Sequence, residues 1–283
     1  MGIQDFTADE DWEDPFEIDT SVAHPARRYN YWLGGNDNFE ADRISGDAVR
    51  AVFPTIQTAA LENRRFLRRA VTYLVKEAGI RQFLDFGTGI PSADNVHEVA
   101  QSIAPETRVV YVDNDPIVLA HARRLLDSTP VGATAYIHAD LRDSDAIFDH
   151  PDLRKILDLG QPIGLMLIAV LHFFVDAADP HSIVSRLVGG LPSGSYFAAS
   201  HITADFMSDQ QRETIEATVE RESSRSRDPG QLRDKAAFTR FFEGTELVPP
   251  GVVSITEWHS DTPPDERPAA ADAMSYGAVG RIP

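Results

Sequence analysis

Residues 82–93 read Gln-Phe-Leu-Asp-Phe-Gly-Thr-Gly-Ile-Pro-Ser-Ala, and this stretch decides the fold. Its apolar start is typical of a strand that is buried on both faces of a parallel sheet. Gly87 and Gly89 follow at once, and residues without a Cβ allow a sharp turn and a close approach of backbone to ligand. Pro91 suits the first turn of a helix, whose free N–H groups attract electron-rich groups. The stretch therefore predicts a strand, a ligand-binding glycine turn and a helix start.

Asp85, two residues before the first glycine, discriminates between classes of ligand. A dinucleotide site follows the pattern G-x-G-x-x-G/A, and the last position of that pattern is Ser92 here, with Pro91 before it. The fit to a dinucleotide is therefore poor. A carboxylate at the end of the strand suits a cationic group instead.

The composition narrows the class of protein. With 283 residues, 42% of them hydrophobic, the chain is long enough for one large α/β domain. Cys is absent, which excludes disulfides and thiolate zinc sites, and no metal site is predicted. The net charge of −18 argues against binding to nucleic-acid phosphates or to an anionic membrane. The start lacks a secretory signal, and the longest apolar run, residues 163–175, is shorter than the ~20 residues of a membrane span. We therefore expect a cytoplasmic protein with a small-molecule substrate.

The N-terminal segment divides into a tail and an arm. Residues 1–20 carry eight acidic residues and no base, which is typical of a solvated tail, and we place this tail at residues 1–24. In residues 25–57, aromatic side chains alternate with polar ones around Gly34 and Gly35. This segment is either a lid that covers a ligand and excludes water or an arm packed on the main domain, residues 58–283.

The second strand supplies a candidate ligand for a ribose. Residues 58–78 and 96–103 have the apolar spacing of helices, and residues 108–113 form an apolar run that ends in Asp113. Asp113 lies 24 residues past Gly89, close to the ~20 residues at which a second-strand carboxylate binds ribose hydroxyls in doubly wound folds. Asn114 follows it. Asp115 and Pro116 are then expected to open a helix that turns Val118, Ala122 and Leu125 inward.

Later strands deliver further candidates to the same edge of the sheet. Asp140 and Leu141 follow a strand at residues 133–138, where a carboxylate can accept from an adenine amino group and a backbone N–H can bond a ring nitrogen. A fourth strand, residues 163–171, delivers His172, and a fifth, residues 195–199, delivers Ser200 and His201. Each histidine is a candidate base for an acceptor, with an ordinary pKa near 6.5.

The remaining sequence predicts the rest of the sheet and adds no further candidate site residues. Residues 205–242 are expected to be helical in two pieces, and residues 252–258 and 276–281 to form a closing pair of strands.

Three features resemble class I S-adenosylmethionine (SAM) methyltransferases in their order and spacing: the turn at Asp85–Gly89, Asp113, and the pair Asp140-Leu141. Residues 28–39 read Arg-Tyr-Asn-Tyr-Trp-Leu-Gly-Gly-Asn-Asp-Asn-Phe; together with residues 82–98 and 109–122 they are similar to a bacterial family of S-adenosyl methyltransferases. The likeness extends from about residue 25 to residue 283. Pro91 departs from the general class motif, which has a third glycine there.

The resemblance implies a fold, a cofactor and a set of binding residues. The fold is α/β, the Rossmann-like class I methyltransferase fold, with a seven-stranded mixed sheet of order 3-2-1-4-5-7-6, strand seven antiparallel, and helices on both faces. The cofactor is SAM. The residues expected to bind it are Asp85, Gly87, Thr88, Gly89, Asp113, Asn114, Asp140, Leu141, Val170, Tyr31, Gly34 and Gly35.

The leading interpretation is an enzyme that moves the methyl group of SAM to an oxygen or nitrogen of a small molecule, with His172 or His201 as base. The activity of an enzyme that depends on such a base would fall below pH ~6.5, because the imidazole becomes protonated. Two alternatives remain: a SAM-binding sensor or scaffold without catalysis, and a dinucleotide-dependent oxidoreductase. The family resemblance gives no acceptor.

Overall fold

The computed structural model describes residues 19–283 except 93, 116, 119–120, 122–127 and 224–228. The acidic tail up to residue 18 lies outside the described residues. So do Ala122 and Leu125, two of the three residues expected to face inward from the helix after Asp115.

One mixed sheet organises the chain, with the order β3-β2-β1-β4-β5-β8-β6 and with β7 also paired to β8. Strands β1 to β5 run parallel to one another, and β8 runs antiparallel to β5. The strands are β1 (Gln82–Phe86), β2 (Arg108–Asp113), β3 (Ala133–His138), β4 (Gly164–Ile168), β5 (Tyr196–Ile202), β6 (Glu246–Leu247), β7 (Val253–Ser254) and β8 (Ser275–Arg281). The predicted order is confirmed, with β8 in the place of strand seven.

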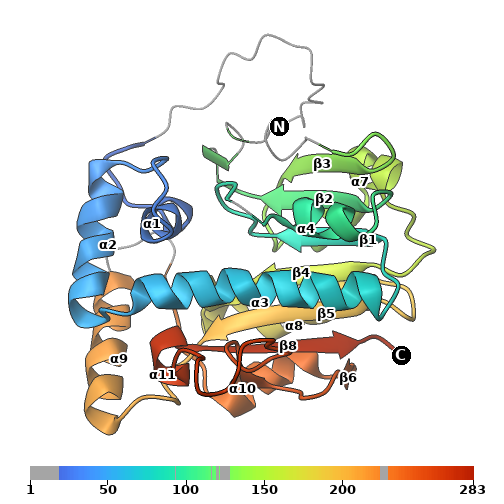
Figure 1. The fold of residues 1–283 in the computed structure, drawn as a ribbon. Helices are drawn as coiled ribbons and strands as arrows, with labels where there is room; N and C mark the ends of the chain where they lie inside the picture. The colour runs from blue at the N-terminus through green and yellow to red at the C-terminus, as the bar shows by residue number, and fades with distance from the viewer. Residues whose placement is uncertain (1–18, 93, 116, 119–120, 122–127, 224–228) are drawn as a thin grey trace.

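Alternate residues of the central strands face two separate apolar cores. In β1, Phe83 belongs to one core and Leu84 to the other, and every residue of the strand is buried. The first core contains residues of α3 (Ile56–Lys76) and α4 (Val96–Ile103). The second contains residues of α6 (Ser144–Phe148), α7 (Pro151–Ile156) and α8 (Pro180–Gly189). The sheet is therefore covered by helices on both faces, and Figure 1 shows α3 crossing one of them.

Three further helices stand beside the carboxyl ends of the parallel strands. These are α1 (Pro25–Trp32), α2 (Glu40–Val52) and α9 (Asp209–Ser223), grouped at the left in Figure 1. The short helices α10 (Lys235–Thr239) and α11 (Ala270–Ala273) and the 3₁₀ turns η1 (Leu171–Phe173), η2 (Asp176–Ala178) and η3 (Arg240–Phe242) complete the described elements. No helix in the described part of the chain has both the length and the apolarity to cross a membrane.

Two predicted boundaries near the carboxyl ends are wrong. The helix after the glycine turn begins at Val96, as the apolar spacing of residues 96–103 predicted, and not at Pro91. Asn95 is its N-cap, and the N–H of Asn95 donates to the Glu98 carboxylate at 2.8 Å in a capping box. The fourth strand ends at Ile168, and the chain turns at Ala169, which has a left-handed φ of 56°. A loop therefore separates the glycine turn from its helix, and a 3₁₀ turn carries His172.

The predictions for the fifth strand and the closing pair also need correction. β5 runs to Ile202, so Ser200 and His201 lie inside the strand, paired with β8, rather than after it. The strand expected at residues 252–258 is only β7, followed by turns. The physical reason is that the carbonyls of Ile255 and Trp258 accept hydrogen bonds from the Arg69 guanidinium instead of from a neighbouring strand.

Candidate active site

A cavity of about 550 Å³ opens beside the carboxyl ends of the strands, where ligands bind in open α/β sheets. The glycine turn and the end of β2 form one part of its lining, and η1, α3 and α9 form another. Helix α1 also contributes to the lining. Of the residues predicted to bind a cofactor or an acceptor, those that line it are Asp85, Gly87, Thr88, Gly89, Asp113, Asn114, Leu141, Val170 and His172.

The glycine turn has a conformation that other residues rarely adopt. Gly87 and Gly89 have φ values of +65° and +64°, in the left-handed region. A Cβ on Gly87 would lie 2.6 Å from Cγ2 of Val170, whereas one on Gly89 would lie 3.9 Å from the Cβ of Ala26. The turn is therefore packed between the end of β4 on one side and α1 on the other.

Asp85 is a buried carboxyl that lines the cavity. Burial raises its pKa to about 7, against the opposing effects of the Arg64 guanidinium and a hydrogen bond with Thr88. Near neutral pH both the protonated and the ionised forms of such a group are populated. A cationic group beside it would favour the carboxylate, which is the chemistry expected from the sequence.

Asp113 connects the ends of the first two strands. Its Oδ2 accepts from the N–H of Gly89 at 2.9 Å, and its Oδ1 accepts from the N–H of Asp115 at 2.9 Å. Burial raises the pKa of this carboxyl, and the two N–H groups oppose that effect. Because a carboxylate offers about four acceptor sites, two remain for a ligand that brings a pair of hydroxyls. Asn114 and Leu141 line the cavity beside it.

Asp140 does not line the cavity. It is held by Arg142, whose Nε donates to Oδ1 at 2.8 Å and whose guanidinium also donates to Oδ2. Arg142 itself lines the cavity. Arg142, and not Asp140, therefore lines the cavity at the place where the sequence predicted an acceptor for an adenine amino group.

Tyr31, Gly34 and Gly35 lie away from the cavity. The Tyr31 hydroxyl donates to Asp47 at 2.9 Å, and Gly34, with φ +81°, follows the end of α1. Gly35 packs on the side chain of Asn30. These residues shape the arm itself.

The arm lines the cavity through other residues, on one face of α1: Pro25, Arg28, Tyr29 and Trp32. This face repeats at helical spacing, so reading residues 25–32 as a helix would have selected these residues and turned Tyr31 away. Before α1, His24 lies with Nδ1 2.7 Å from Oδ2 of Asp115. Asp115 accepts from the N–H of Ile117, as predicted for an N-cap. The arm is thereby attached to the loop that follows β2.

A hydrogen-bond network ties α1 to the centre of the sheet. The Tyr29 hydroxyl donates to the carbonyl of Ala60 and accepts from Asn63, whose side-chain oxygen accepts from Ser200 at 2.5 Å. Ser200 in turn accepts from the N–H of Ala169 at 3.0 Å. Asn63 and its neighbour Arg64 line the cavity, although an exposed face is the usual place for such residues.

His172 lies in the cavity wall with 9% of its surface exposed. Its Nδ1 is buried and has no hydrogen-bond partner among the residues that the structure describes. Burial lowers the pKa of His172 to about 3, and the positive charges of Arg233 and Arg28 add to this effect. Burial therefore favours the neutral imidazole, and the loss of activity that the sequence predicts below pH ~6.5 is not expected from this residue.

His201 is not part of the cavity lining, and both of its ring nitrogens are engaged. Nε2 lies 2.8 Å from a guanidinium nitrogen of Arg233, which can only donate, so Nε2 accepts. Nδ1 then carries the proton and donates to the carbonyl of Ile202 at 2.8 Å. This arrangement leaves no ring nitrogen of His201 to take a proton from an acceptor.

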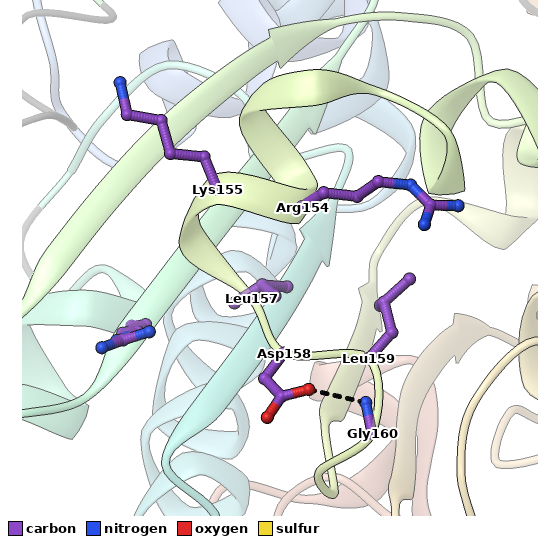
Figure 2. Close-up of a pocket in the computed structure, with 7 residues that line it drawn as sticks. Arg154, Lys155, Leu157, Asp158, Leu159 and Gly160 are labelled. Carbon is purple, nitrogen blue, oxygen red and sulfur yellow. Dashed lines mark hydrogen bonds between the residues drawn. The ribbon is translucent and has the colours of Figure 1, made fainter.

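A second hollow, of about 400 Å³, lies near the start of β2, at the opposite edge of the sheet (Figure 2). It is lined by Arg108, Arg154, Lys155, Leu157, Asp158, Leu159 and Gly160, with Asp158 bonded to the N–H of Gly160. It contains none of the predicted site residues. In the described ranges there is also no cluster of three His, Asp or Glu side chains placed to hold a metal ion.

A known protein family matches almost the whole chain. The profile of the S-adenosyl methyltransferase family matches residues 11–283. The chain belongs to this family. The resemblance found in the sequence is thereby confirmed, and SAM is the cofactor that the family's name specifies.

Two crystal structures are similar over almost the whole chain. A DUF574 family protein from Streptomyces avermitilis is 49% identical, with a TM-score of 0.89, over 94% of this chain and 100% of that one. A candidate methyltransferase from Thermobifida fusca is 39% identical, with a TM-score of 0.81, over 93% of this chain and 96% of that one. Among curated proteins, none matches.

Proposed function

We propose that this member of the family transfers the methyl group of SAM to an oxygen or nitrogen of a small molecule. The observation that carries the proposal is the shared cavity: the glycine turn, Asp85 and Asp113 line the same space as His172 and apolar side chains of α3 and α9. One part of the space suits a cofactor, and the other has room for a second reactant. The net charge of −18 supports a small-molecule acceptor over a nucleic acid or a membrane.

The residues present fit SAM group by group. The free acceptor sites of Asp113 suit the ribose hydroxyls, and Asn114 and Leu141 line the place expected for the adenine. Asp85 suits the positive charge of the methionine end. Arg64 is close enough to lower the pKa of Asp85 and suits a carboxylate.

Bound SAM supplies an electrophilic methyl carbon, so the chain's own task is to align the acceptor and to exclude water. The arm contributes the closing surface for this: Ala26 lies over the glycine turn, and Trp32 lines the cavity on the same helix. We therefore propose that residues 25–57 act as a cover for the site, with residues 58–283 as the catalytic domain.

A calorimetric titration with SAM and, separately, with NAD tests the proposal. SAM binding together with methyl transfer from labelled SAM to a compound in a panel of hydroxyl and amine acceptors is the expected result. NAD binding in place of SAM would favour an oxidoreductase. SAM binding with no methylated product across the panel would favour a sensor or scaffold.

A further inference from the structure

The cavity has a second end, away from the glycine turn, and we call it the apolar end. It consists of lining residues that belong to one packed apolar cluster: Phe53, Ile56, Ala59, Ile215, Val219 and Met274. They come from the C-terminus of α2, from α3, from α9 and from the residue before β8. Segments far apart in the sequence therefore build one apolar wall, which is the usual lining of a small-molecule site.

The spacing of the lining residues shows that side chains, and not backbone, face this space. On α9 the lining residues are Ile215, Thr218, Val219 and Ser223. On α3 they begin with Ile56, Ala59, Ala60, Asn63 and Arg64. Both sets recur at intervals of three and four residues, which is the repeat of one face of a helix. Each helix therefore turns one face of side chains toward the cavity.

The lining face of α3 runs from the apolar end to the cofactor end. Ile56 and Ala59 belong to the apolar cluster, whereas Arg64 lies close enough to Asp85 to lower its pKa. Ile56 and Arg64 are eight residues apart in the sequence. At the rise of an α-helix, this separation is about 12 Å along the axis. An acceptor on the apolar wall would therefore adjoin the proposed place of the methionine end of SAM in the same cavity.

Polar side chains on the same faces are hydrogen-bonded within the protein. The Thr218 hydroxyl donates to the carbonyl of Thr214 at 2.8 Å, and the Ser223 hydroxyl donates to the carbonyl of Gly230 at 2.9 Å. The side chain of Asn63 is bonded through both its nitrogen and its oxygen. Since these groups already have partners, the contact that a ligand gains at this end is chiefly apolar.

The charged side chains of the lining lie elsewhere. Of the described residues that line the cavity, the acids are Asp85 and Asp113, and both lie at the strand ends that hold the glycine turn. The lining faces of α2 and α9 carry no charged residue in the part of the chain that the structure describes. A charged group on this wall would lose its water without gaining a counter-ion. The wall therefore favours a neutral ligand.

We propose that the methyl acceptor is a neutral, mostly apolar molecule, and that it binds on the apolar end through shape and apolar contact and not through an ion pair. Its nucleophilic atom then faces the cofactor end, the direction in which the lining face of α3 changes from apolar to polar. This inference rests on the proposed function and adds the class of the acceptor to it.

The first test compares three probes that share one ring system and differ in charge. Naphthalenemethanol is neutral, naphthoate is an anion and naphthylmethylamine is a cation at neutral pH. Each is titrated by calorimetry into the full chain saturated with S-adenosylhomocysteine, which lacks the methyl group that SAM transfers. We expect the neutral probe to bind more tightly than either charged probe by about tenfold or more. Tighter binding of a charged probe, or no binding of the neutral one, would overturn the inference.

Two alanines provide matched variants for the two ends of the cavity. Ala59 lies on the apolar wall, whereas the Cβ of Ala26 lies 3.9 Å from the position of a Cβ on Gly89. Leucine adds the same three carbons at either site. Ala59→Leu should weaken naphthalenemethanol by about tenfold or more and change the affinity for SAM by less than about twofold. Ala26→Leu should instead weaken SAM by about tenfold or more.

The melting curves of both variants, followed by circular dichroism, show whether they are folded. An Ala59→Leu protein that binds the neutral probe as the wild type does would contradict the proposal. So would an Ala59→Leu protein that loses SAM and the probe to the same extent.

Val219→Asp provides a gain of binding that a distorted protein cannot imitate. Val219 is partly buried on α9 and lines the apolar end. A carboxylate there supplies the missing counter-ion, so naphthylmethylamine should bind about tenfold more tightly than to the wild type, while naphthalenemethanol binds more weakly. An unchanged order of the three probes would exclude the wall as their binding site. Failure of the protein to bind SAM in the same calorimeter would instead remove the proposed function, so the two failures are distinguishable.

Discussion

Replacement of Gly87 by Ala tests the packing of the glycine turn, because Gly89→Ala provides a matched control. Both glycines have nearly the same left-handed φ, +65° and +64°. An L residue in that conformation costs about 1–2 kcal/mol at either position. Only at Gly87 does the new Cβ also meet Val170, at 2.6 Å from Cγ2 and 2.9 Å from Cβ.

The overlap with Val170 adds the cost of overpacking, about 1–3 kcal/mol. We therefore expect Gly87→Ala to lower the free energy of unfolding by about 2–5 kcal/mol and Gly89→Ala by about 1–2 kcal/mol. Urea titration monitored by circular dichroism measures both values.

Val170→Ala provides the decisive comparison. Val170→Ala removes Cγ2, the atom nearest the new Cβ, but keeps the Cβ of residue 170 at 2.9 Å. Gly87→Ala should therefore be less destabilising in the Val170→Ala background than in the wild type, by a part of the overpacking cost of about 1–3 kcal/mol. The reasoning is refuted if the two glycine variants are equally stable, or if the effects of Gly87→Ala and Val170→Ala simply add.

Four further predictions concern the ligands. Asp113→Ala should weaken SAM binding by about 1.5–3 kcal/mol in a calorimetric titration, the loss of hydrogen bonds to a charged group, and unchanged affinity would exclude it from ribose binding. Because the pKa of Asp85 is raised to about 7, the free protein at pH 6 must release a proton to bind a cation, so SAM affinity should rise up to about tenfold from pH 6 to pH 8. Asp85→Asn should abolish that part of the dependence, and the same slope in this variant would contradict the assignment. Since the pKa of His172 is lowered to about 3, its protonation should not reduce methyl transfer down to pH 5, and a titration near pH 6.5 that disappears in His172→Asn would show the opposite. Deleting residues 1–18 should leave the affinity for SAM intact, and deleting residues 1–39 should weaken it. Equal affinities of the two truncated proteins would show that the arm only packs on the main domain and does not help to bind SAM.

The exact bounds of a strand could be predicted in places where the local sequence pattern and the tertiary structure coincide. β2 and β3 have the bounds expected from their apolar runs, because each is completed by parallel neighbours of the same length. The bounds of the closing strands could not be predicted, because the path of residues 255–258 depends on Arg69. This residue lies 186 residues from Ile255 along the chain.

The site shows the same division between local and distant determinants. The glycine turn and Asp113 are recognisable because their spacing follows from one strand-turn-helix unit and the next strand. The difference between His172 and His201 is not visible in the sequence. It depends on Arg233, 32 residues after His201, which donates to one histidine and only lowers the pKa of the other.

The two ends of the cavity are built from different parts of the chain, and this has a consequence for how the family can diversify. The cofactor end consists of loops that leave the sheet, where a substitution such as one at Gly87 disturbs the folded core. The apolar end, which includes Phe53, Ile215 and Val219, draws on the end of α2 and on α9, which stand outside the sheet. Under the proposed function, substitutions at Phe53, Ile215 or Val219 would change the range of acceptors while the cofactor loops stay as they are. A library confined to these positions is the direct route to variants that methylate a chosen compound.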